Sequence, residues 1–129
     1  MDRVCHFEIP YEDQERAAKF YQDVFGWQIM PAPHEMPYFF AITTEVDETH
    51  NPQKPGGING GMYERQEGPA AKGPVIVIEV ESCDQRIKDI EAAGGKALMP
   101  SQNVGDMGVY AQVQDCEGNI IGLWQPLNG

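Results

Sequence analysis

Two side chains near the N-terminus combine residue types that transfer protons or bind metal ions. His6 and Glu8 are separated by one residue within 4–9, where apolar and polar residues alternate with the period of a strand. Alternate residues of a strand point to the same face, so the imidazole and the carboxylate share a face. Such a pair can act as a general base with an orienting carboxylate, or as two metal ligands. A third interpretation is structural, with His6 lining a cavity and bound to a backbone carbonyl group or to Glu8.

A second set of residues indicates ligand binding. Gly60 and Gly61 lie in one predicted strand and Gly122 in another, where a missing side chain leaves room for a ligand or for close strand packing. Tyr63 follows Gly61 by two residues and Trp124 follows Gly122 by two residues, so each aromatic ring shares a strand face with its glycine. Aromatic walls are typical of small-molecule pockets, and core or dimer-interface packing explains them equally well. We predict ligand contacts from Asn59, Gly61, Tyr63, Gly122 and Trp124.

Other polar residues give weaker indications. His34 and His50 lie in predicted loops, and we expect no role for them. Tyr110 and Gln112 share a strand face, but the alternation does not say whether that face is buried or turned toward a ligand.

The elements that carry these residues recur in the same order in both halves of the chain. The hydrophobic periodicity predicts a strand, a helix and three further strands in residues 1–63, a linker at 64–74, and the same series in residues 75–129. Neither half is large enough for a core of its own, so we expect them to pair in one domain. The predicted strands are 4–9, 27–30, 38–43, 58–63, 75–80, 96–99, 108–113 and 120–125, and the predicted helices are 13–26 and 84–93.

Two alignments express the repeat. The helix ends align at an offset of 69 residues, which places Val75 in the position of His6. The last strands align at an offset of 61 residues, which places Gly122 in the position of Gly61. A longer loop around residues 46–55 of the first half absorbs the difference.

The composition excludes several kinds of partner. Acidic residues outnumber basic residues by 20 to 9, and the net charge is −11. Such a surface repels phosphate backbones and anionic lipids, so we expect no binding to nucleic acid or to membranes. There is no apolar segment typical of a signal peptide or a membrane span. The three cysteines form no Cys-x-x-Cys pair, which fits reduced thiols, and we expect a soluble, cytoplasmic protein.

Two stretches resemble a known family in their order and separation. Residues 6–27 combine a strand, an acidic turn and a helix that ends in FYQDVFGW, and residues 115–124 combine the turn DCEGN with the last strand. Both resemble the glyoxalase, bleomycin-resistance and extradiol-dioxygenase domains of the vicinal oxygen chelate superfamily, although Cys116 stands where proline is common. The resemblance covers almost the whole chain. It implies an α+β fold in which two βαβββ units pair, with curled mixed sheets around a central cup, and it implies a homodimer.

The resemblance also implies where a metal ion would bind. In this superfamily a divalent metal is usually held by one side chain from the first strand and one from the last strand of each unit. These four positions fall on His6, Gly61, Val75 and Gly122, and three of them have no side chain that can bind a metal. Because catalytic sites need about three protein ligands, we expect no cofactor. Zinc, nickel, iron or manganese would bind only through ligands outside the usual set.

Three functions stay open at this point. The first is a glyoxalase-like domain that binds a small, partly apolar molecule in its cup without metal, with His6 and Glu8 as the catalytic residues of any reaction. The second is a metal-dependent lyase, isomerase or dioxygenase of the same superfamily. The third is an interaction domain whose cup no longer binds a ligand. We favour the first, because the usual ligand set is incomplete while glycines and aromatic residues line the expected cup.

Overall fold

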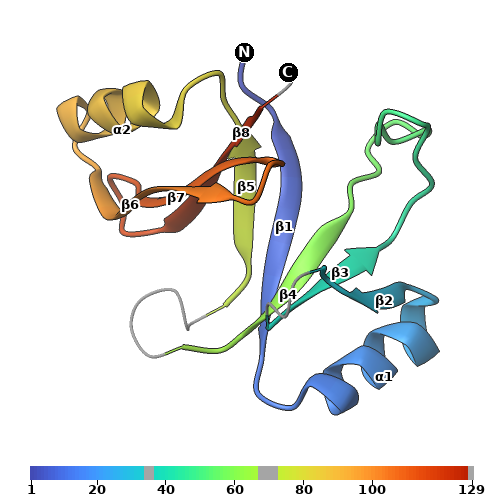
Figure 1. Ribbon diagram of the computed structural model, residues 1–129. Helices are drawn as coiled ribbons and strands as arrows, with labels where there is room; N and C mark the ends of the chain where they lie inside the picture. Colours follow the sequence, from blue (N-terminus) through green and yellow to red (C-terminus); the bar gives the residue numbers. More distant parts are fainter. Residues whose placement is uncertain (34–36, 67–72, 128–129) are drawn as a thin grey trace. The chain divides into compact units, whose positions relative to one another are not determined.

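The chain contains two compact units, each built from one helix and four strands. The computed structural model describes residues 1–33, 37–66 and 73–127. One unit comprises residues 6–74, here called the first unit, and the other comprises residues 1–5 together with 75–129, here called the second unit. Each unit has the order strand, helix and three strands, which confirms the expected α+β fold with two βαβββ units (Figure 1).

The first unit places four strands in the order β2-β3-β4-β1. Strand β1 and strand β4 are parallel, and the remaining neighbours are antiparallel. One helix, α1, connects β1 to β2 and lies against one face of this sheet (Figure 1). The bounds are β1 (Val4–Tyr11), α1 (Gln14–Phe25), β2 (Gln28–Pro31), β3 (Tyr38–Ile42) and β4 (Gly60–Glu64).

Helix α1 begins and ends at the residues that the sequence indicates. The Asp13 side chain accepts a hydrogen bond from the backbone N–H of Arg16, which satisfies a donor that the first helical turn leaves unpaired. At the other end Gly26 adopts φ 74°, a left-handed conformation that costs glycine nothing. The side chains of Ala17 and Tyr21 pack on the sheet. The core beneath the helix is formed by Tyr11, Ala41 and Met62, with Phe7, Ile9, Trp27, Ile29 and Phe39 around them.

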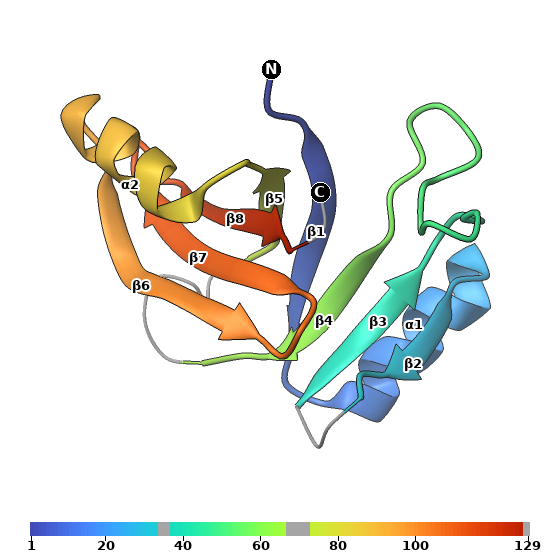
Figure 2. The same cartoon turned by 45° about the horizontal axis from the view of Figure 1, so that its top comes forward.

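The second unit repeats this arrangement. Its strands have the order β5-β8-β7-β6, with β5 and β8 parallel and the other neighbours antiparallel. Helix α2 lies over one face of the sheet (Figure 2). The Ser82 side chain caps it by accepting a hydrogen bond from the N–H of Gln85. The bounds are β5 (Val75–Glu79), α2 (Cys83–Ala92), β6 (Lys96–Val104), β7 (Gly108–Gln114) and β8 (Ile120–Pro126).

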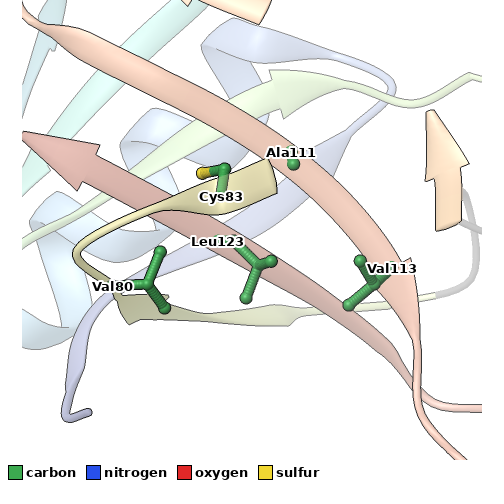
Figure 3. Packing of buried hydrophobic residues seen from close by; sticks show 5 residues of the cluster. All are labelled: Val80, Cys83, Ala111, Val113 and Leu123. Carbon is green, nitrogen blue, oxygen red and sulfur yellow. The ribbon is translucent and has the colours of Figure 1, made fainter. Parts of the chain in front are cut away.

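The core of the second unit joins the start of α2 to its sheet. Cys83 and Ala111 have no exposed surface, and the other three members of the cluster are at most 3% exposed. Figure 3 shows these five side chains pointing toward one another from α2, from the strands and from the segment before the helix. The cluster consists of Val80, Cys83, Ala111, Val113 and Leu123.

Three strands have a bound that differs by two or more residues from the sequence-based expectation. Strands β1 and β6 continue through Pro10 and Pro100, because the fixed φ of proline is compatible with an extended chain wherever no ladder hydrogen bond needs its missing N–H. The β6 ladder shifts its register between Met99 and Gln102, on either side of Pro100. Strand β4 begins at Gly60, two residues later than expected. The expected linker at 64–74 includes residues 67–72, and these, like His34, lie outside the described residues.

Neither of the two described helices is long and apolar enough to cross a membrane.

Candidate functional site

The two faces of the first unit's sheet carry different side chains. Cross-strand register places Phe7, Gly60, Ala41 and Ile29 in one row, on the face that α1 covers. The neighbouring row points the other way and joins Glu8, Gly61, Phe40 and Met30. We call this second surface the helix-free face of the first unit. Its members are His6, Glu8, Pro10, Gln28, Met30, Tyr38, Phe40, Ile42, Gly61 and Tyr63.

A hydrogen bond between His6 and Tyr38 is the most specific polar contact on this face. The Nε2 atom of His6 lies 2.8 Å from the hydroxyl oxygen of Tyr38. Tyr38 pairs with Tyr63 in the sheet, so its ring must extend over Gly61 to reach the histidine. A Cβ atom at Gly61 would overlap the phenol of Tyr38. Position 61 therefore has to be glycine for the hydrogen bond to form.

The helix-free face of the first unit carries a buried acidic group and a neutral imidazole. Burial lowers the pKa of His6 to about 4, so the ring is neutral near pH 7. Glu8 is only 8% exposed. Burial, and after it the nearby Glu8 carboxylate, raises the pKa of the Tyr63 hydroxyl. The predicted catalytic pair thus shares one face, and His6 forms its hydrogen bond with Tyr38.

Two of the predicted ligand-binding residues also have contacts with the backbone. The side-chain oxygen of Asn59 accepts hydrogen bonds from the N–H groups of Thr43 and Thr44, at 2.8 and 2.9 Å. This side chain joins the end of β3 to the residues just before β4. The hydroxyl of Tyr63 donates to the carbonyl oxygen of Gly73 at 3.4 Å. Both residues therefore have structural roles.

The second unit contains an equivalent arrangement on its own helix-free face. The register joins Val77, Gly122 and Gln112 in one row, and joins Trp124 to Tyr110 in the next. A Cβ atom at Gly122 would lie 3.0 Å from the hydroxyl oxygen of Tyr110. That oxygen accepts a hydrogen bond from Gln112 Nε2 at 3.1 Å. The helix-free face of the second unit therefore includes Tyr110 and Gln112, which the strand alternation alone could not assign.

The register between paired strands also shows the repeat residue by residue. Glu8 pairs with Gly61 in the first unit, and Val77 pairs with Gly122 in the second. These pairs reproduce the offsets of 69 and 61 residues. Tyr38 and Tyr110 stand two residues before the strand partners of the two glycines and are thus equivalent. Sequence reasoning missed Tyr38 and left the face of Tyr110 open, although an alignment of the third strand of each half would have placed one tyrosine over the other.

The residues at the four implied metal positions do not fit a divalent metal ion. His6 alone offers a ligand atom, and its Nε2 is bound to Tyr38. At Gly61 and Gly122 a tyrosine ring lies against the place where a side chain would begin. Within residues 1–33, 37–66 and 73–127, no cluster of three or more His, Cys, Asp or Glu side chains could hold a metal. The side chains at these four positions therefore do not form a site for metal-assisted chemistry.

Two of the cysteines are poorly suited to nucleophilic chemistry. Burial, and after it the negative charge of Glu79, raises the pKa of the Cys5 thiol to about 11. Burial and then Asp84 raise the pKa of Cys83 to about 11 as well. Thiolate is the reactive form, and it is scarce at neutral pH in both residues.

Comparison with known proteins bears on the family and the fold of this chain. A model of the bleomycin resistance protein-like N-terminal family matches residues 3–44. A glyoxylase-like domain-containing protein of Didymella fabae is 30% identical over 121 residues, which cover 91% of this chain and 88% of that protein. The chain belongs to the glyoxalase-like family. The sequence-based identification of the vicinal oxygen chelate superfamily is thereby confirmed.

Other relatives of this glyoxalase-like domain are longer or more distant. A putative glyoxylase, CFP32, of Mycobacterium tuberculosis is 27% identical over 124 residues, which cover 92% of this chain. The chain spans 43% of the length of that relative. A methylmalonyl-CoA epimerase of Streptomyces coelicolor, solved in complex with 2-nitronate-propionyl-CoA, superposes with a TM-score of 0.66 at 18% identity over 97% of both chains. Likeness at this level of identity shows the fold alone.

Proposed function

We propose that this glyoxalase-like domain binds a small, partly apolar molecule and does so without the divalent metal of its superfamily. One observation carries the proposal. At both positions where a metal-binding carboxylate is expected, the chain has a glycine with a tyrosine ring against it. The same combination of glycine and tyrosine occurs in both repeats, and the chance loss of a single metal ligand would not produce it twice.

The composition of the helix-free faces supports a ligand with apolar surface. The first unit presents the rings of Tyr38, Phe40 and Tyr63 around its glycine, and the second presents Tyr110 and Trp124. Aromatic surface with a small number of placed polar groups is typical of sites for small organic molecules. Any reaction at the first unit would use His6 and Glu8, with the neutral imidazole as the proton acceptor.

The alternative is a metal-dependent lyase, isomerase or dioxygenase. It would require ligands other than those at the four implied positions, for example Glu8 together with His6 and a residue of a second chain. Homodimerisation and a cytoplasmic location remain predictions that accompany both functions.

A native mass spectrum of protein purified without added metal or chelator tests the proposal. We expect a metal-free protein, and an additional organic mass where a ligand co-purifies. A spectrum in denaturing solvent is the control, because a non-covalent ligand is lost there and a covalent adduct is retained. One divalent metal ion per chain would contradict the proposal and favour the metal-dependent alternative, and a His6→Ala variant would then show whether His6 holds that metal.

A further inference from the structure

Helix α1 exposes three large apolar side chains. Phe20, Val24 and Phe25 are 55%, 58% and 59% exposed. The rings of Phe20 and Phe25 lie against each other, with their centroids 6.2 Å apart, and Val24 follows Phe20 by four residues on the same side of the helix. We call these three residues the α1 patch. Single exposed apolar residues are common on protein surfaces, whereas adjoining ones mark a site of interaction.

The equivalent helix of the second unit shows that the fold does not require this patch. At the offset of 69 residues, α2 and its C-terminal end have small or charged residues at the positions of the α1 patch, namely Asp89, Ala93 and Gly94. Asp89 is exposed and pairs with Arg86 at 2.8 Å. Among the described residues, none of the large apolar side chains that are exposed lies on α2. The α1 patch therefore serves a purpose other than the folding of a βαβββ unit.

The charges around the α1 patch favour a second copy of this chain as its partner. The chain has a net charge of −11, so two copies repel each other wherever their acidic groups face each other. Helix α1 is different, because its two acidic and two basic side chains cancel. Arg16 and Asp23 stand four residues before and three residues after Phe20, and they are both exposed on its side of the helix. A surface with no net charge gives no attraction to a basic partner or to an anionic membrane.

Antiparallel packing of two α1 helices would pair these charges. Copies related by a two-fold axis present the same surface to each other. With the axis at Phe20, this ring meets its counterpart, and position 16 of one helix lies beside positions 23 and 24 of the other. Arg16 then lies next to Asp23 of the second copy, twice in each dimer. Asp23 is paired with Lys19 of its own helix, and its two oxygens have room for a second donor.

We propose that the exposed side of α1 is an interface between two copies of this chain, in which the α1 helices pack antiparallel around Phe20 and Arg16 of each copy pairs with Asp23 of the other. This surface lies on the α1 side of the first unit's sheet and not on the helix-free face, so the inference does not depend on the proposed function. The homodimer expected from the family resemblance has no assigned surface, and this inference assigns one.

Sedimentation velocity of the full chain between about 1 µM and about 300 µM tests for the second copy. We expect a dimer with a dissociation constant below about 100 µM. Phe20→Asp gives α1 the residue type that α2 has at this position, and we expect it to raise the dissociation constant at least roughly hundredfold. Met107→Asp is the matched control, because Met107 is 48% exposed and lies between β6 and β7. It should leave the dissociation constant unchanged, and circular dichroism shows whether both variants are folded.

An exchange of charges tests the antiparallel arrangement. Arg16→Asp brings two carboxylates together in a homodimer, and Asp23→Arg brings two guanidinium groups together. We expect each variant alone to have a dissociation constant at least roughly tenfold higher than that of the wild type. In an equimolar mixture, each changed side chain meets the opposite charge on the other variant. The mixed dimer should therefore form with a dissociation constant within roughly threefold of the wild-type value.

Three results would overturn this interface. A wild type that stays monomeric at every concentration would exclude the second copy, and sedimentation with phosphatidylcholine vesicles would then show whether the α1 patch binds a membrane instead. Equal effects of Phe20→Asp and Met107→Asp would place the dimer contact on another surface. A mixture of Arg16→Asp and Asp23→Arg that associates no better than either variant alone would exclude the antiparallel arrangement, and it would do so even if Phe20→Asp did not fold.

Discussion

At Gly61 the absence of a side chain decides what the neighbouring residues can do. The phenol of Tyr38 fills the space next to the Gly61 Cα and reaches His6. Substituting Gly61→Ala forces the ring away, and overpacking of this kind costs about 1–3 kcal/mol. We expect a loss of that size in the free energy of unfolding, measured by denaturant titration.

A double-mutant cycle shows whether Tyr38 is the cause of this loss. In a Tyr38→Ala background the space is open, so Gly61→Ala should cost little there, and the two substitutions should not be additive. Gly73→Ala is the control, because a Cβ atom at Gly73 meets nothing within 4 Å. Additive effects at positions 38 and 61 would show that the overlap does not govern the stability of this site.

The protonation of His6 should link stability to pH. Its folded-state pKa is about 4, whereas the unfolded chain has the ordinary value near 6.5. Between these pH values the unfolded state binds the proton and the folded state does not. The contribution of His6 to the free energy of unfolding is therefore fully present above pH 6.5 and is lost as the pH falls toward 4. The loss amounts to at most about 3 kcal/mol.

Denaturant titrations between pH 4.5 and 7.5 measure this contribution. Many carboxylates titrate near the lower limit, so the relevant quantity is the difference between wild type and His6→Gln. We expect the wild type to lose more stability than the variant on acidification. Parallel curves would mean that His6 is protonated as easily in the folded state as in the unfolded state.

At the scale of elements, the sequence predicted the features that depend only on residues close together in the chain, such as the ends of helices. Helix α1 has Asp13 and Gly26 at its ends, and both are local signals that need no knowledge of the fold. The hydrogen bond between His6 and Tyr38 joins residues 32 positions apart and depends on the pairing of three strands. The same holds for the face occupied by Tyr110, which is fixed only when β7 pairs with β8.

Asn59 shows how one side chain can hold two elements together. Its oxygen accepts from two backbone N–H groups at the end of β3, and it stands directly before β4. Asn59→Ala leaves both donors without this partner, which we expect to lower the free energy of unfolding by about 1–3 kcal/mol. Asn59→Asp keeps an acceptor in the same place and should retain most of the stability. Equal losses in the two variants would show that this oxygen is not the important group.

At the scale of the molecule, the repeat explains why the site can be described twice. Each unit pairs its first strand with its last, and each presents a glycine next to a tyrosine from the third strand. The two copies differ in the polar partner of the tyrosine, which is His6 in the first unit and Gln112 in the second. The family resemblance implied a metal position at each of the two glycines. The tyrosines beside these glycines became apparent only from the register of the paired strands.

The charge of the whole chain leads to a prediction about salt. With a net charge of −11, the acidic groups repel one another in the compact state more than in the unfolded chain. The ion pairs that salt would weaken, such as Lys19 with Asp23, are exposed and contribute little. Repulsion should therefore dominate the effect of salt. We expect the midpoint temperature of thermal unfolding to rise between about 10 mM and 300 mM sodium chloride, because the Debye length falls from about 30 Å to below 10 Å. Potassium chloride should act equally, and replacing the exposed Glu48 and Glu117 by glutamine should reduce the salt dependence. A midpoint that falls with salt would instead mean that attractive pairs outweigh the net charge in this fold.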